Sequence, residues 1–220
     1  MQIQNNSTQS LKISNLELSL EGKKLLSINE EIQGGEVLTV MGPSGSGKST
    51  LLNWLVGLLP SGFEATGELT LNEKDITNIA SHQRHIGLLY QDPLLFPHLT
   101  VEGNIAFAMP KGDKKKRRET ISESLAQVGL AGMERRCPDS LSGGQQARVA
   151  LLRVLLSQPQ AILLDEPFSK LDSQLRQDTR QLVFEQIKQH RIPVVMVTHD
   201  ESDAIAAEGK VIKLDDTALT

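Results

Sequence analysis

The stretch from Gly42 to Ser49, GPSGSGKS, has the residue types and spacing that bind a nucleotide phosphate. Its glycines let successive backbone N–H groups converge on phosphate oxygens, because no Cβ blocks the approach. A helix is expected to begin there, and its N-terminus adds the positive end of the helix dipole. In this chemistry Lys48 reaches the β- and γ-phosphates, and Ser49 is a ligand of Mg²⁺. A glycine-rich turn without a ligand is the alternative, and the flanking strand and helix argue against it.

An acidic pair, Asp165 and Glu166, follows the apolar run AILL. Ligands of open α/β sheets bind at the carboxyl ends of the strands, so Asp165 is expected to hold Mg²⁺ through water at that edge. Glu166 then stands where it can accept a proton from an attacking water. Taken alone, such a run is more often a core strand followed by an exposed turn. The phosphate loop elsewhere in the chain favours the catalytic interpretation.

The segment LSGGQ at 141–145 precedes a predicted helix. A serine and two glycines at a helix N-terminus make a second anion-binding surface. One domain that binds one nucleotide needs only one such surface. We therefore expect the second surface to contact a nucleotide held by another copy of the chain, in an isologous dimer with two composite sites.

The elements that must position these residues alternate between strands and helices. Apolar periodicity predicts strands over 11–20, 24–32, 36–41, 66–72, 86–90, 161–165, 193–198 and 211–214. Helices are predicted over 49–59, 100–107 with Thr100 as cap, 117–129, 144–157, within 172–189 and over 200–207. The first two strands are expected to pair antiparallel through a turn at Glu21-Gly22, whereas the later alternation predicts an α/β fold with a parallel sheet.

The composition limits the class of protein. The chain has 220 residues, 39% of them hydrophobic and 23% charged, which excludes a disordered or collagen-like chain. Its net charge of −4 gives no general attraction to nucleic acid. The single cysteine, Cys137, fits a reducing compartment, and no signal peptide or membrane span is expected. The basic run 114–118 is read as a solvated face, with lipid headgroups as the alternative, and because it opposes the helix dipole the helix is expected to begin near Arg117.

These motifs together resemble the ATP-binding subunit of ABC transporters, over essentially the whole chain. In order they are Walker A at 42–50, the Q-loop glutamine Gln91, the signature at 141–145, Walker B at 161–166, the D-loop at 169–172 and the switch histidine His199. The resemblance implies one ABC ATPase domain over 1–220 with a RecA-like P-loop NTPase core and a mainly parallel sheet. It also implies an antiparallel β part at about 10–35 and 62–80, and an inserted helical subdomain at about 92–158.

The resemblance implies a role for each motif residue, with ATP and Mg²⁺ as cofactors. Glu166, His199 and Gln91 would be catalytic, and Ser49, Gln91 and Asp165 would hold Mg²⁺. His199 is similar to the residue that hydrogen-bonds the γ-phosphate, and Asp172 to the aspartate that bridges the two sites of the dimer. The nucleotide would be bound by Gly42, Pro43, Ser44, Gly45, Ser46, Gly47, Lys48, Ser49 and Thr50 of one subunit and by Ser142, Gly143, Gly144, Gln145 and Asp172 of the other.

One feature departs from the family pattern. Most relatives stack adenine on an aromatic residue upstream of Walker A, but the equivalent stretch here, about 18–24, has none, and neither has any other part of the first 53 residues. We expect Leu20 or a neighbour to pack on the base instead, with modest discrimination between purines.

Residues 91–107 and 165–172 resemble the ATPases of binding-protein-dependent bacterial importers, such as those for thiamine, ferric iron, polyamines, sulfate or molybdate. The implied partners are a second copy in a head-to-tail ATP-sandwich dimer, two transmembrane permease subunits and, indirectly, a periplasmic binding protein, with no nucleic acid. The implied location is the cytoplasmic face of the inner membrane. Phe96, Pro97, His98 and Leu99 would form the surface that receives the permease, a packed loop core being the alternative.

Other classes remain open at this point. An exporter-type or lipid-handling ABC ATPase, or a soluble ABC ATPase, shares the same motifs, whereas a soluble P-loop kinase would share Walker A and would not need LSGGQ. Because the chain ends six residues after its last predicted strand, we expect no regulatory β-domain.

Overall fold

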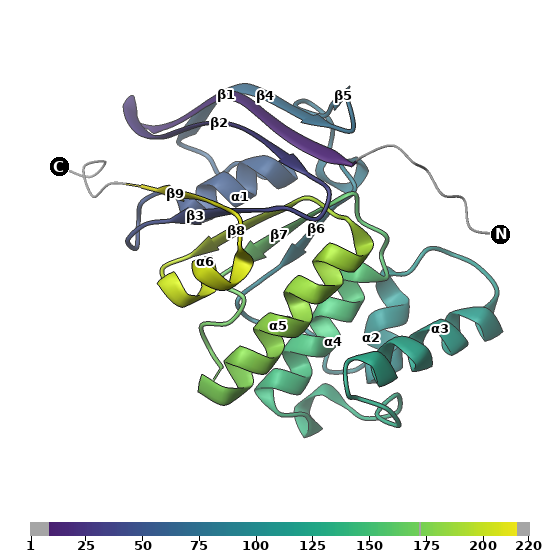
Figure 1. The fold of residues 1–220 in the computed structure, drawn as a ribbon. Coiled ribbons are helices and arrows are strands. Elements are labelled where there is room, and N and C mark those ends of the chain that lie inside the picture. The colour runs from purple at the N-terminus through teal and green to yellow at the C-terminus, as the bar shows by residue number, and fades with distance from the viewer. Residues whose placement is uncertain (1–8, 172, 215–220) are drawn as a thin grey trace.

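Two β-sheets enclose one helix and carry the others on a single side (Figure 1). The computed structural model describes residues 9–171 and 173–214. The antiparallel sheet has the order β2-β1-β4-β5 and the parallel sheet the order β6-β7-β8-β3-β9. The strands are β1 (Ser10–Leu20), β2 (Lys23–Gln33), β3 (Val37–Met41), β4 (Phe63–Leu71), β5 (Lys74–Asp75), β6 (Ile86–Leu89), β7 (Ala161–Asp165), β8 (Val194–Thr198) and β9 (Lys210–Lys213).

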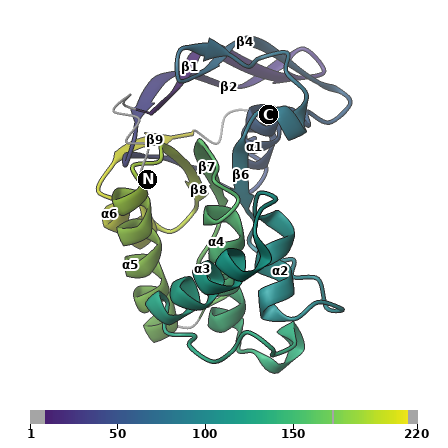
Figure 2. The same cartoon turned by 90° about the vertical axis from the view of Figure 1, so that its right-hand side faces the viewer.

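The helices divide between the two faces of the parallel sheet. Helix α1 lies between the two sheets, and α4, α5 and α6 cover the other face, with α2 and α3 packed beside α4 (Figures 1 and 2). The helices are α1 (Lys48–Val56), α2 (Val101–Ala108), α3 (Lys114–Gln127), α4 (Gly143–Leu155), α5 (Ser173–His190) and α6 (Glu201–Ala207), with 3₁₀ turns η1 (Ser81–Gln83) and η2 (Pro138–Ser140). The predicted α/β class with a mainly parallel sheet is confirmed.

The central strands are buried on both faces because helices cover both. All five residues of β3 and of β8 are buried, as are the first four of β7. These runs are continuous and rich in β-branched residues, the pattern expected of a parallel sheet with two covered faces. One apolar core joins α1 to both sheets, a second packs α4 and α5 on the parallel sheet, and a third lies among α2, α3 and α4.

Helix α3 begins earlier than its charge pattern indicated. The predicted start near Arg117 is wrong, since the helix includes the basic run from Lys114 onward. Asp113 explains the difference: its carboxylate accepts a hydrogen bond from the backbone N–H of Lys116 at 2.9 Å. An acidic N-cap satisfies an orphan donor and offsets the unfavourable cations.

The end of α1 is fixed by a buried arginine. Helix α1 stops at Val56 because Gly57 takes a left-handed conformation with φ 80°, so the predicted extension toward Pro60 is not formed. Arg84, which is 5% exposed, donates to the carbonyls of Trp54 and Leu55 at 2.9 and 3.0 Å. It also donates to the carbonyls of Ile79 and Thr77, which lie beyond the antiparallel sheet's β5. The guanidinium thereby ties this helix to the chain that follows the sheet.

Candidate nucleotide-binding and catalytic site

Parallel pairing brings three loops to the same edge of the sheet. Met41 of β3 pairs with Thr198 of β8, and Asp165 of β7 pairs with Val197. The chain segments that follow these three strands begin with Gly42, Glu166 and His199. The carboxyl edge of the sheet therefore carries residues from all three loops, as the strand ends predicted.

The loop between β3 and α1 is closed on its own lysine. Lys48, 7% exposed, donates from Nζ to the carbonyl oxygens of Gly42 and Pro43, both at 2.7 Å. Gly45 and Gly47 have φ of 84° and 89°, which L side chains rarely adopt. A cavity of about 270 Å³ opens on this loop. Its lining from the loop and its neighbours comprises Ser44, Gly45, Gly47, Lys48, Ser49, Thr50 and Glu166.

Charges of opposite sign meet beside this cavity without enough solvent to screen them. Burial lowers the pKa of Lys48, against the opposing effect of Glu166 and Asp165. Burial and the neighbouring Glu166 raise the pKa of Asp165, and Lys48 opposes that shift. The ionised pair of carboxylates is therefore unfavourable in the ligand-free site, and a divalent cation beside it would relieve the repulsion.

Glu166 and His199 contact each other directly. The imidazole Nδ1 lies 3.2 Å from the carboxylate Oε1, with the glutamate side chain 23% exposed and the histidine 61% exposed. The backbone N–H of Glu166 donates to the carbonyl of Val197 at 3.0 Å, and the residue has φ 44°. This bond extends the β7–β8 pairing by one residue and turns the carboxylate toward the cavity that it lines. A carboxylate beside a phosphate loop and an imidazole can accept a proton from water.

The segments around Gln91 and Ser169 are joined by two contacts. The amide Nε2 of Gln91 donates to Ser169 Oγ at 2.9 Å, and that hydroxyl donates to the carbonyl of Glu166 at 2.9 Å. Next to it, Lys170 forms an ion pair with Asp92. The structure thus places Gln91 two hydrogen bonds from the backbone of Glu166. Asp172, the remaining D-loop residue of the prediction, lies outside the described residues.

Arg176 joins the same region to the segment after β8, and sequence reasoning missed it. Its guanidinium forms an ion pair with Asp200, the neighbour of His199, at 2.7 Å. It also donates to the carbonyls of Ser169 and Leu171 at 3.3 and 3.4 Å. Its position one turn into α5, at the start of a polar helix, offered no signal that would separate it from a solvent-facing arginine.

The predicted signature residues are not brought to this cavity. Ser142 caps α4, accepting from the N–H of Gln145 at 3.4 Å, while Gln145 Oε1 accepts from the N–H of Ser142 at 3.0 Å. Ser142 and Gly143 are exposed, whereas a Cβ on Gly144 would lie 2.4 Å from Leu175. Within 9–171 and 173–214, no residue of 141–145 lines the cavity on the phosphate loop. Figure 1 places the start of α4 at the opposite end of the molecule from the antiparallel sheet.

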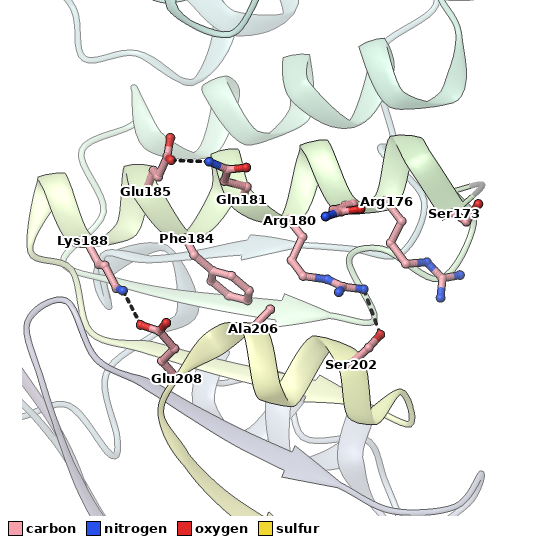
Figure 3. Close-up of a pocket in the computed structure, with 11 residues that line it drawn as sticks. Ser173, Arg176, Arg180, Gln181, Phe184, Glu185, Lys188, Ser202, Ala206 and Glu208 are labelled. Carbon is pink, nitrogen blue, oxygen red and sulfur yellow. Dashed lines mark hydrogen bonds and ion pairs between the residues drawn. The ribbon is translucent and has the colours of Figure 1, made fainter.

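A larger cavity, about 610 Å³, lies between α5 and α6 (Figure 3). Its cations already have carboxylate partners: Arg176 pairs with Asp200, Arg180 with Asp203 at 2.6 Å, and Lys188 with Glu208 at 2.8 Å. Figure 3 shows Arg180 and Lys188 reaching across to α6. This cavity therefore offers little unbalanced charge and none of the groups that converge at the phosphate loop.

The fold and this site define a P-loop nucleotide-binding protein, and comparison with known proteins gives its family. The sequence profile of the family described as "ABC transporter" matches residues 25–169. The chain belongs to the ABC transporter family, as one of its ATP-binding proteins and an ATPase. The resemblance predicted from the six motifs is confirmed.

Three relatives illustrate this membership. The chain is 47% identical to an uncharacterized ABC transporter ATP-binding protein, YnjD, of Escherichia coli K12, over 93% of this chain and 94% of that one. It is 36% identical to the spermidine/putrescine import ATP-binding protein PotA of Vibrio cholerae and 38% identical to the Fe(3+) ions import ATP-binding protein FbpC 2 of Pectobacterium atrosepticum. These two matches include 92% and 96% of this chain, but only 54% and 61% of the lengths of the two import proteins.

Among the helices of the described residues, none is both long enough and apolar enough to cross a bilayer.

Proposed function

We propose that this chain is the ATP-hydrolysing subunit of a binding-protein-dependent importer at the cytoplasmic face of the inner membrane. The observation that carries the proposal is the convergence of Lys48, Asp165, Glu166 and His199 at one sheet edge, with the signature serine left exposed elsewhere. Two relatives are named as import ATP-binding proteins, which supports import as the direction.

Within the site, phosphate would replace the present contacts of Lys48 and would give the Ser46 hydroxyl a partner. Lys48 would give up its hydrogen bonds to the carbonyls of Gly42 and Pro43 and bind phosphate oxygens instead. The loss of conformational entropy should be small, because the loop is already formed. The hydroxyl of Ser46 is buried and has no hydrogen-bond partner within the described residues, so it too is free to receive one. Residues 42–50 would in this way bind the triphosphate.

The carboxylates and their neighbours would do the chemistry. Glu166 accepts the proton of the attacking water, and His199, in contact with it, hydrogen-bonds the γ-phosphate. Ser49, Asp165 and Gln91 fit a Mg²⁺ site because they offer oxygen ligands and because Asp165 is an electrostatically unfavourable carboxylate without a cation. The bound ion would supply charge neutralisation at the phosphates.

A second copy would complete each site. Ser142, Gly143, Gly144 and Gln145, together with Asp172, would contact the nucleotide held by the partner's phosphate loop in a head-to-tail dimer. The exposure of Ser142 and Gly143, at the far end of the helical layer from α1, supports contact with a partner over contact within one chain. Two equivalent sites then follow from the twofold symmetry.

The surface beside α2 is proposed as the docking site of the permease subunits. Phe107 is 69% exposed and Leu94 57% exposed, and the ring of Phe96 packs edge-on against Phe107 with centroids 4.8 Å apart. Pro97 and His98 are exposed as well, whereas Phe96 and Leu99 are half-buried. The buried Asn104 holds this loop rigid by bonding the backbone of Phe96, Leu99 and Thr100. An exposed aromatic side chain that packs against a rigid loop is typical of an interface.

Co-expression with the membrane subunits encoded by adjacent genes tests this proposal. Phe107→Ser should cut the yield of the complex about tenfold, the loss expected for an interface aromatic, while the ATPase rate of the isolated chain stays unchanged. Leu58→Ser, at a side chain that is 57% exposed and lies next to α1, is the matched control. Stimulation of hydrolysis by a periplasmic binding protein added to the reconstituted complex supports import. An intact complex that ignores the binding protein would instead assign the chain to an exporter.

A further inference from the structure

One aromatic side chain stands at the phosphate-loop cavity, although none precedes that loop in the sequence. The chain has seven aromatic residues, and all lie within the described part. Trp54, Phe168 and Phe184 are buried in the core. Of all seven, Phe63 is the one that lines the cavity on the phosphate loop, together with Leu20 and Leu25.

The pairing of strands explains how Phe63 reaches the cavity. It is the first residue of β4, and in the β1–β4 register it lies opposite Leu20, the last residue of β1. Gly62, with φ 88°, precedes it and returns the chain from α1 into the sheet. Phe63 therefore lies at the end of a strand, where its backbone is held by pairing between β1 and β4.

The hairpin formed by β1 and β2 packs on the phosphate loop. A Cβ placed on Gly47 would lie 3.3 Å from Leu26 and 3.6 Å from Leu25, so β2 approaches the start of α1 closely. Leu20 and Leu25 flank the turn between β1 and β2, and Phe63 is half-buried beside them. The three side chains make an apolar wall at a fixed position relative to the residues that would hold phosphates.

We propose that Phe63 is the surface on which the base of the bound nucleotide stacks, with Leu20 and Leu25 at its sides. The inference rests on the proposed binding of a nucleoside triphosphate by residues 42–50. It replaces the expected packing of the base on Leu20 or a neighbour with stacking on the aromatic ring that lies opposite Leu20 in the β1–β4 pair. Stacking is tolerant of base identity because every base has a π-face, and a wall of Leu and Phe offers no hydrogen bond that would read adenine.

Two ligands separate this contact from the phosphate contacts: ATP, and inorganic tripolyphosphate, which has no base. Phe63→Ala should raise the Kd of ATP about 5- to 100-fold, the range expected for the loss of base–aromatic stacking. The Kd of tripolyphosphate should change by less than about twofold, since Phe63 does not hold phosphate. Leu58→Ala, which removes an exposed apolar side chain outside the cavity, should change neither constant.

Phe63→Trp gives a second readout that does not depend on truncation. This variant should keep its affinity for ATP, and its added tryptophan fluorescence should respond to ATP but not to tripolyphosphate. The proposal is overturned if Phe63→Ala leaves ATP affinity unchanged, or weakens both ligands equally, which would make Phe63 a support of the loop. Wild-type protein that binds neither ligand would overturn the nucleotide site itself, a result distinct from either.

Discussion

Two helices of this chain begin at glycine-rich segments, and their N-termini are completed in opposite ways. Helix α1 follows Gly47, which has no side chain to cap the helix, and the pKa values of the buried Lys48 and the partly buried Asp165 beside it are shifted. Helix α4 follows Ser142, which forms a reciprocal capping box with Gln145 and has no acidic residue in its first turn. The start of α1 has no side-chain cap, whereas the start of α4 supplies partners for two of its own backbone donors.

The difference shows how a site can be divided between two copies. The α1 end concentrates Lys48, Asp165 and Glu166, and burial disfavours the charged forms of Lys48 and Asp165 in the ligand-free protein. The α4 end can stay exposed on a free subunit because a capping box gives two of its N–H groups a partner. Its serine would then reach a partner's nucleotide by donating its hydroxyl hydrogen to a phosphate oxygen, since the 3.4 Å contact uses Oγ only as an acceptor.

The largest expected effect comes from a variant whose site at the start of α1 binds ATP but does not hydrolyse it. In Glu166→Gln the amide is nearly isosteric but accepts no proton, so ATP hydrolysis should fall by about 10²- to 10⁴-fold while ATP binding persists. The nucleotide at the start of α1 in one copy should then stay in contact with the start of α4 in the other, giving an ATP-dependent dimer in size-exclusion chromatography. Glu185→Gln, on the surface of α5 and hydrogen-bonded to Gln181, is the control. Wild-type turnover in Glu166→Gln would remove this residue from its proposed role.

A mixture of two inactive variants tests whether the start of α4 acts on the nucleotide bound at the start of α1 in the other copy. Ser142→Arg damages the α4 end and Lys48→Ala the α1 end, so each protein alone should be nearly inactive. If the signature acts on the partner's nucleotide, a mixed dimer has one site with both ends intact, and phosphate release should rise to as much as half of the wild-type rate per dimer.

The control for that mixture is a dimer of one damaged subunit with wild type, isolated through two tags. If tagged heterodimers form but show no gain, the single-lesion dimer decides the cause. An active single-lesion dimer would mean that the signature acts within its own chain, and an inactive one that both sites must be intact together.

The smallest effect concerns the stability of the ligand-free protein, where the two ends should respond with opposite sign. Ser142→Ala removes a cap and should lower the free energy of unfolding by about 1 kcal/mol. Asp165→Asn removes a buried carboxylate whose charged form is disfavoured and should raise the free energy of unfolding. Urea unfolding at pH 7 measures both, and a loss of stability in Asp165→Asn would contradict the assigned environment.

The pH dependence of the second variant follows from the direction of the pKa shift. Because the pKa of Asp165 is raised in the folded protein, the folded state binds more protons than the unfolded state between 3.8 and the raised value. Wild-type stability therefore falls as the pH rises through this window. The advantage of Asp165→Asn should be complete above the window and shrink as the pH drops toward 3.8.

Much of the fold was readable from the sequence because its central strands carry strong apolar signals. The strands β3, β7 and β8 lie within a residue or so of their predicted limits, and the meeting of Gly42, Glu166 and His199 followed from where those strands end. The two-residue β5 and the 3₁₀ turns are too short to have a period and were not predicted. The start of α3 was misplaced because the cap at Asp113 outweighed the charge run.

What the sequence could not supply was contact between distant segments. Phe63 reaches the cavity through its register with Leu20, and no local pattern sets the register between strands separated by a helix. Gln91 and Ser169 are 78 residues apart, and Arg84 finds the end of α1 from a loop 29 to 30 residues away. The capping box was different: Ser142 and Gln145 have the spacing of that motif, so the signal was present.

Two contacts, Gln91–Ser169 and Asp92–Lys170, join the segment of Gln91 to that of Ser169, and their strength limits how tightly the two segments can be coupled. The pair of Lys170 and Asp92 is half exposed on both sides, and an exposed ion pair contributes about 0.2–1 kcal/mol, close to the thermal energy of about 0.6 kcal/mol. Exposed side chains change rotamer within about nanoseconds, whereas a typical enzyme turns over in milliseconds or longer, so a link of this strength should open and close many times in one turnover. In the proposed transporter, residues 91–99 would therefore be coupled to residues 169–171 through a shift in populations, and a permease or a second copy would each bias the link without having to break it.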